Sequence, residues 1–272
     1  IVNQLAFQDI KKNEETFDGL IRIRRYPSPI DMPKLPKIPN DYKENQKKEV
    51  IEYAIKNWKK SQDRVCEKKE LHFFKTHNML CKLKIGPQEF QFTDVKNSIG
   101  VIHIIRDPRN VVTSIKNHFN HKNINESINM IKDPHRWTGF KNNETPQLLS
   151  SWSNHFNSWK RFPKNNLLIR YEDLIQNIDY EIKRIINYLS SFIKIEITQK
   201  EINSVIENSS FENLSKLEQE GKFKENSLDI DGKANRFFNL GPKNNWKRVL
   251  EKESIDSITS AFEEEMIELG YL

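Results

Sequence analysis

The stretch Val101-Ile-His-Ile-Ile-Arg106-Asp-Pro-Arg-Asn-Val-Val-Thr-Ser114 decides the fold. Its first five residues are mostly β-branched and apolar, as in a buried strand, and a helical pattern begins directly after Arg-Asp-Pro. The free amides of a helix's first turn attract anions, and ligands of open α/β sheets bind beyond the carboxyl ends of the strands. We therefore predict that Arg106 and, two helical turns later, Ser114 bind an anionic group.

The same residues also have a purely structural interpretation. Asp107 could cap the helix, Pro108 could occupy its first position, and Arg106 could pair with a carboxylate. Both interpretations remain open from this stretch alone.

Length and composition favour one α/β domain over residues 1–272. Strand patterns alternate with long helical ones, and 44 basic against 38 acidic residues give a net charge of +6. This surplus is spread along the chain, so it suits an anionic ligand, and we expect no nucleic-acid partner. Cys66 and Cys81 form neither a CxxC nor a zinc pattern, which favours reduced thiols and a cytoplasmic location. No apolar run is long enough to span a membrane.

Hydrophobic periodicity predicts the order of the elements. We expect strands at 71–77, 101–105 and 167–171, and helices at 43–62, 110–119, 147–161, 174–190, 198–208 and 251–269. Two segments are expected to be loops near the acceptor and donor pocket: the proline-rich residues 20–45 and the charged, Asn-rich residues 212–245.

Three of the expected strands end in groups that suit transfer of an anionic group. These are Lys75-Thr-His77, Arg106-Asp107 and Tyr171-Glu172. Lys75 and His77 should share one face of a strand, because side chains alternate with a period of two. A histidine can take a proton from an alcohol or phenol near neutral pH, and a lysine can neutralise developing negative charge.

Several motifs together resemble the cytosolic-type sulfotransferase family, in that family's order and over about residues 1–270. They are Phe74-Lys-Thr-His77, Ile105–Ser114, Ser151–Trp159, Arg170-Tyr-Glu-Asp-Leu174, Ser209-Ser-Phe211, Phe237–Gly241 and Trp246-Lys247. The resemblance implies a P-loop-kinase-like parallel sheet flanked by helices. It also implies a sulfuryl donor, 3′-phosphoadenosine-5′-phosphosulfate (PAPS), and no metal.

The resemblance assigns a role to each matching residue. His77 would deprotonate the acceptor and Lys75 would balance charge on the transferring group. The residues implied for the donor are Arg106 and Ser114 at the 3′-phosphate, Tyr171 and Phe211 at the adenine, Ser209 where the family usually has threonine, and Gly241 at the end of the family's Arg-Lys-Gly motif. The reaction implied is in-line sulfuryl transfer to an oxygen or nitrogen of a small-molecule or carbohydrate acceptor, with release of adenosine 3′,5′-bisphosphate (PAP).

Two departures from the family pattern qualify this expectation. The family's 5′-phosphosulfate loop and first strand are not found, and we expect them upstream of Ile1. Asn239-Leu240-Gly241 replaces Arg-Lys-Gly, so Arg236 or Lys243 is a candidate for the missing cations. The alternatives are a non-catalytic nucleotide- or glycan-binding protein with this fold, a phosphotransferase of the wider P-loop class and, last, a basic nucleic-acid-binding module. The sequence predicts neither the acceptor nor the oligomeric state.

Overall fold

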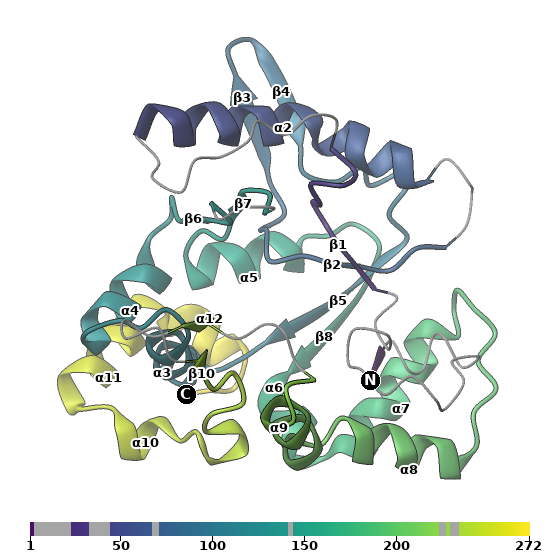
Figure 1. Cartoon of the computed structure of the whole chain (residues 1–272), viewed down its shortest axis with the longest axis vertical. Helices are drawn as coiled ribbons and strands as arrows, with labels where there is room; N and C mark the ends of the chain where they lie inside the picture. Colours follow the sequence, from purple (N-terminus) through teal and green to yellow (C-terminus); the bar gives the residue numbers. More distant parts are fainter. Residues whose placement is uncertain (3–22, 33–43, 67–70, 141–143, 223–226, 229–233) are drawn as a thin grey trace. The chain divides into compact units, whose positions relative to one another are not determined.

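The computed structural model describes residues 1–2, 23–32, 44–66, 71–140, 144–222, 227–228 and 234–272 (Figure 1). Contacts divide the described chain into two compact units. The first contains Ile102–Ile131 and Leu167–Leu272, and the second contains Ile23–Val101 and Lys132–Asn166.

The first unit is helix-rich and is built on the strands β5 and β8, each of which has its first two residues in the second unit. Its elements are β5 (Gly100–Ile105), α3 (Pro108–His118), α4 (Ile124–Lys132), β8 (Asn165–Arg170), α6 (Tyr171–Gln176), α7 (Ile178–Leu189), α8 (Gln199–Asn208), α9 (Phe211–Gln219), β9 (Ser227–Leu228), β10 (Ala234–Asn235), a 3-10 turn (Gly241–Lys243), α10 (Trp246–Val249), α11 (Lys252–Ala261) and α12 (Glu263–Glu268). β5 and β8 pair in one sheet and run in the same direction in Figure 1. Each is followed by a helix, so the sheet is of the α/β type.

The helix after β5 begins where local chemistry predicts. The carboxylate of Asp107 accepts a hydrogen bond from the backbone N–H of Arg109 at 2.9 Å, and Pro108 occupies the first turn. The basic residues Lys116 and His118 lie in the last turn, where the negative end of the helix dipole stabilises a positive charge. Val112 is fully buried, so this short helix is held by tertiary packing as well as by its cap.

Apolar side chains from distant segments form the core of the first unit. Val112 of α3, Ile169 of β8 and Ile182 of α7 are at most 1% exposed, as are Ile258 and Met266 from the C-terminal helices. Burying such side chains is the main favourable term in folding, at about 1.5–3 kcal/mol each.

The second unit carries short strands under one long helix. Its elements are β1 (Arg24–Arg25), α2 (Glu44–Cys66), β2 (Phe74–Lys75), β3 (Lys82–Ile85), β4 (Gln88–Gln91), β6 (Trp137–Thr138), β7 (Gln147–Leu148) and α5 (Trp152–Lys160). β1 pairs in parallel with β2, so that Arg25 lies opposite Lys75. The antiparallel pairs are β3 with β4 and β6 with β7; in the first unit β9 and β10 pair in the same way.

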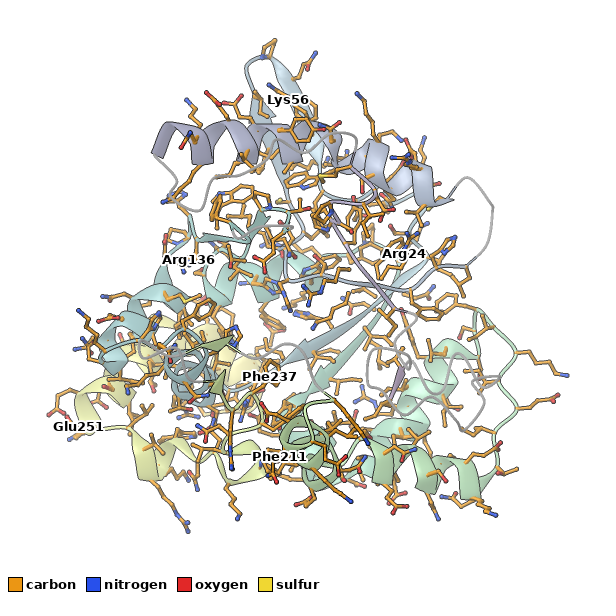
Figure 2. The ribbon with its side chains drawn as sticks, in the orientation of Figure 1. Arg24, Lys56, Arg136, Phe211, Phe237 and Glu251 are labelled. Atoms are coloured by element: carbon orange, nitrogen blue, oxygen red, sulfur yellow. The ribbon has the colours of Figure 1, made fainter. Side chains whose placement is uncertain are left out.

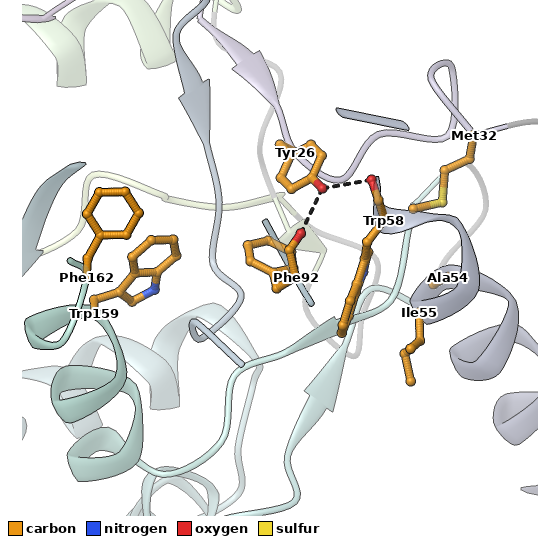
Figure 3. Packing of buried hydrophobic residues seen from close by; sticks show 8 residues of the cluster. All are labelled: Tyr26, Met32, Ala54, Ile55, Trp58, Phe92, Trp159 and Phe162. Carbon is orange, nitrogen blue, oxygen red and sulfur yellow. Dashed lines mark hydrogen bonds between the residues drawn. The ribbon is translucent and has the colours of Figure 1, made fainter. Parts of the chain in front are cut away.

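An aromatic cluster fills the core of the second unit (Figure 3). Trp58 of α2 is fully buried and meets Phe92 edge to face, with ring centroids 5.3 Å apart. The Tyr26 hydroxyl lies 2.9 Å from the carbonyl oxygen of Trp58 and 2.8 Å from that of Phe92, so the polar end of this buried ring is satisfied. Burial is the main cause that raises the pKa of Tyr26.

Several expected elements differ from those observed. The strand expected over 71–77 pairs only at Phe74–Lys75, and the helix expected from 147 begins at Trp152. Ser150 has a positive φ of 59° and Ser151 caps the helix, so β7 must end before α5 starts. The expected loop 212–245 contains α9, which Ser210 caps by accepting a hydrogen bond from the amide of Asn213. The expected loop 20–45 contains β1; its residues 20–22 and 33–43 lie outside the described part of the chain.

Candidate functional site

The first unit brings Arg106, Ser114 and Tyr171 together. The Arg106 Nη1 atom donates a hydrogen bond to Ser114 Oγ at 3.1 Å, and the guanidinium lies over the Tyr171 ring, 4.4 Å from its centroid. All three side chains are half-buried. A cation, a hydroxyl and an aromatic face therefore meet where β5 and β8 end, which is a combination suited to a nucleotide phosphate and its base.

The turn between β5 and α3 is fixed by a buried ion pair. Arg109 Nη2 lies 2.7 Å from Asp107 Oδ2, and both side chains are 6% exposed. The Arg109 guanidinium also stacks on Trp246, 3.9 Å from its ring centroid. The capping role expected of Asp107 is thus confirmed, and its negative charge is neutralised by Arg109 beside the anion-binding candidates.

Glu172 links the ends of the two strands. It accepts a hydrogen bond from the backbone N–H of Asp107 at 3.1 Å and another from the Tyr271 hydroxyl at 2.9 Å. Burial and the Glu172 charge raise the pKa of Tyr271. Because Glu172 follows Tyr171 directly, these contacts hold Tyr171 beside Arg106.

Phe211 and Gly241 form a second contact of the first unit. A Cβ added at Gly241 would lie 2.2 Å from two atoms of the Phe211 ring, and Gly241 has a positive φ of 50°. Only glycine allows both this backbone conformation and this approach. The ring centroids of Phe211 and Phe238 are 6.3 Å apart. Figure 2 labels Phe211 and Phe237, the residue before Phe238.

An open groove of about 390 Å³ runs along Phe211 between α9 and the following 3-10 turn. Its lining residues are Phe211, Glu212, Ser215, Lys216, Gln219, Pro242 and Lys243. Lys243 is exposed, and so is Arg236, whose backbone carbonyl accepts a hydrogen bond from Asn117 of α3. Both candidates for the missing cations therefore belong to the segment that lies along α3.

The Ser209 hydroxyl forms a hydrogen bond within its own helix. Its Oγ donates to the carbonyl oxygen of Val205 at 2.6 Å, within α8, and its backbone caps that helix. The hydroxyl proton therefore satisfies the end of α8, two residues before Phe211.

Lys75 and His77 lie in the second unit, at and just after the end of β2. Both side chains are exposed, whereas Thr76 between them is half-buried, in keeping with the alternation expected of an extended chain. Gln147 of β7 accepts hydrogen bonds from the backbone N–H of His77 at 2.9 Å and from the Thr76 hydroxyl at 3.3 Å. The backbone that carries His77 is thus fixed while its side chain faces the surface.

The residues behind His77 are buried and hydrogen-bonded. Asn78 is fully buried; its Oδ1 accepts from the Leu148 amide at 2.6 Å, and its carbonyl accepts from Trp159 Nε1 at 2.9 Å. His155 of α5 hydrogen-bonds to the backbone of His77, and burial lowers the pKa of His155 to about 4. His155 lies within the Ser151–Trp159 motif, but nothing in its local sequence shows that it reaches His77.

The described residues contain neither a metal-binding cluster nor a membrane-spanning helix. Among them, no group of three or more His, Cys, Asp or Glu side chains is placed to hold a metal ion. No helix in this part of the chain combines the length and apolarity that crossing a membrane requires.

Known proteins resemble the chain in sequence. Sulfotransferase 2A1 of Macaca fascicularis is 26% identical over 191 residues, which cover 69% of this chain and 62% of that protein. The amine sulfotransferase of Oryctolagus cuniculus is 24% identical over 175 residues, covering 62% of this chain and 55% of that protein. The matches therefore span less than two thirds of these relatives' length.

Solved structures share the fold. Mouse sulfotransferase SULT7A1 complexed with PAP superposes with a TM-score of 0.51 at 15% identity, covering 75% of this chain and 69% of that one. Retinol dehydratase in complex with androsterone and inactive cofactor PAP gives 0.50 at 17% identity, covering 83% and 66%. The sulfotransferase domain family model matches residues 4–270. The chain therefore has the α/β sulfotransferase fold and belongs to the sulfotransferase family.

Proposed function

We propose that the protein transfers a sulfuryl group from PAPS to a hydroxyl or amine of a small-molecule or carbohydrate acceptor. One cluster carries this proposal: Arg106 Nη1 lies 3.1 Å from Ser114 Oγ, and the same guanidinium lies over the Tyr171 ring. Two structures of the same fold were solved with PAP, which supports a nucleotide of this kind here.

The donor residues of the first unit suit the parts of such a nucleotide. The guanidinium of Arg106 and the hydroxyl of Ser114 would bind the 3′-phosphate, and the rings of Tyr171 and Phe211 would contact the adenine. We propose Lys243 or Arg236 as the source of the cation that Asn239 and Leu240 do not provide. Ser209, where the family usually has threonine, would bind the donor from the end of α8, next to Phe211.

PAPS, when bound, supplies an electrophilic sulfur on a phosphate leaving group. The imidazole of His77 would take the proton from the acceptor oxygen or nitrogen as that atom bonds to sulfur. Transfer would break the bond between sulfur and the bridging phosphate oxygen, and the electron pair of that bond would leave with PAP. Lys75 would offset the negative charge that develops, so catalysis comes from positioning and charge stabilisation.

A transfer assay tests this reaction. Radiolabelled PAPS is offered with a panel of phenol, alcohol, amine and sugar acceptors, and His77→Ala is compared with the wild type. A general base contributes about 10²–10⁴-fold, so we expect kcat to fall by that factor while PAP affinity is unchanged. His135→Ala, which removes another exposed histidine of the second unit, is the matched control.

The outcomes separate the alternatives. Undiminished transfer by His77→Ala would remove histidine as the base. PAP binding without transfer to any acceptor would favour a nucleotide-binding protein, and transfer that needs ATP and magnesium would favour a phosphotransferase. We also propose a cytoplasmic location, because both Cys66 and Cys81 are free thiols, as is usual in a reducing compartment.

A further inference from the structure

Ser114 accepts hydrogen bonds from two sides. Arg106 Nη1 donates to its Oγ at 3.1 Å, and Asn244 Nδ2 donates to the same atom at 3.3 Å. A serine hydroxyl has two acceptor lone pairs and one proton, and both partners are nitrogen donors. Among the residues that the structure describes, these contacts are the hydrogen bonds of this hydroxyl, so its proton points away from both.

The orientation of the Asn244 carboxamide is determined by its other neighbours. The atom that faces the backbone carbonyl oxygen of Asn110 lies 3.1 Å from it. A carbonyl oxygen can only accept, so this atom must be the amide nitrogen and not the amide oxygen. The amide oxygen in turn accepts from the Thr113 hydroxyl at 2.8 Å. The same nitrogen therefore donates to Ser114.

Asn244 is also fixed in place. It is 8% exposed, and the backbone N–H of Trp246 donates to Asn110 Oδ1 at 3.0 Å. A buried carboxamide with partners for both its nitrogen and its oxygen has little freedom to rotate. The segment after Gly241 is thereby held against α3 at the turn that carries Ser114.

We propose that Asn244 is a positioning residue of the nucleotide site, which sets the Ser114 hydroxyl as a hydrogen-bond donor toward an anionic oxygen. This inference rests on the proposed function, because the oxygen it addresses is the 3′-phosphate. Without Asn244 the hydroxyl proton can turn toward the vacated position, and it must then be reoriented when the ligand binds. With Asn244 that orientation exists before binding.

A double-mutant cycle tests the coupling. The dissociation constant of PAP is measured calorimetrically for the wild type, Asn244→Ala, Ser114→Ala and the double variant. We expect Asn244→Ala to weaken PAP binding roughly tenfold, as for one hydrogen bond to a charged group, and to have less than about a twofold effect in the Ser114→Ala background. A merely structural asparagine would weaken binding equally in both backgrounds.

Two further variants keep the test decisive. Asn244→Asp has the same shape and still accepts from Thr113, but it presents an acceptor and a negative charge to Ser114, so we expect PAP binding to weaken more than with alanine. Thr113→Val removes the hydroxyl that donates to the carboxamide oxygen, so it loosens Asn244 without deleting it, and we expect PAP binding to weaken less than with Asn244→Ala. Unchanged affinity in Asn244→Asp, or equal effects in both serine backgrounds, would overturn the proposal.

Failure of the proposed function gives a different result. If the wild type does not bind PAP, or if Arg106→Ala binds it as the wild type does, the nucleotide site itself is wrong and the role of Asn244 falls with it. If the wild type binds PAP and Arg106→Ala weakens it while the cycle shows no coupling, only the role of Asn244 is wrong.

Discussion

Replacing Arg106 with alanine probes the proposed phosphate site most directly. The change removes a guanidinium that lies 3.1 Å from Ser114 Oγ and 4.4 Å from the Tyr171 ring centroid. A charge-assisted hydrogen bond contributes about 1.5–3 kcal/mol, and the loss of the Arg106 contact also frees the Ser114 hydroxyl. We therefore expect PAP binding to weaken by about 2–4 kcal/mol, or roughly 30- to 1000-fold in the dissociation constant.

The assay is isothermal titration with PAP at one fixed salt concentration, since contacts to a phosphate depend on screening. Adenosine 5′-monophosphate is the matched ligand, because it lacks the 3′-phosphate. Its affinity should change little in Arg106→Ala, so the difference between the two ligands should shrink. Arg106→Lys keeps the charge but not the two-pronged geometry or the stacking, and we expect an intermediate loss.

The control is Arg248→Ala, which removes an exposed arginine of α10 in the same unit. It lowers the net charge by the same amount, so it should leave PAP binding nearly unchanged. Equal dissociation constants for the wild type and Arg106→Ala would refute the reasoning. A loss of the same size for both ligands would show that Arg106 does not act on the 3′-phosphate.

Two further predictions concern the residues around the candidate site. Gly241→Ala should lose about 2–4 kcal/mol of unfolding free energy in urea, because it combines a strained φ of 50° with a Cβ 2.2 Å from the Phe211 ring. Gly221→Ala is its control: it has a φ of 72° but no atom within 4 Å, so it should lose only the backbone part, and equal losses would contradict the ring contact. His155, whose pKa is about 4 in the folded chain against 6.5 as reference, should remain neutral while the unfolded chain takes up a proton. Stability should therefore fall by up to about 1.4 kcal/mol per pH unit between pH 6.5 and 4, and not above 6.5; His155→Gln should remove that slope in denaturant titrations at each pH.

Local signals predicted the elements that carry the candidate site. β5 was predicted to within one residue from the apolar run before Arg106. The start of α3 was predicted to within two residues, because Asp107 is its cap and Pro108 its first residue. The helix expected over 43–62 is observed as Glu44–Cys66. Boundaries moved where polar turn residues competed with periodicity, as at Ser150 and Ser151 before α5.

The sequence by itself determined that Arg106 and Tyr171 lie at the ends of strands, and that Ser114 lies in the helix after the first of them, in a sulfotransferase pattern. Capping and hydrophobic periodicity act between residues a few positions apart, and they can therefore be seen along the chain. Only the tertiary structure decided which atoms meet. Asn244 reaches Ser114 across 130 residues, and Gly241 admits the ring of Phe211. The hydrogen bond between His155 and the backbone of His77 likewise joins residues far apart in the sequence. Such contacts depend on how buried surfaces pack, because burial rewards close packing without specifying which distant segments supply it.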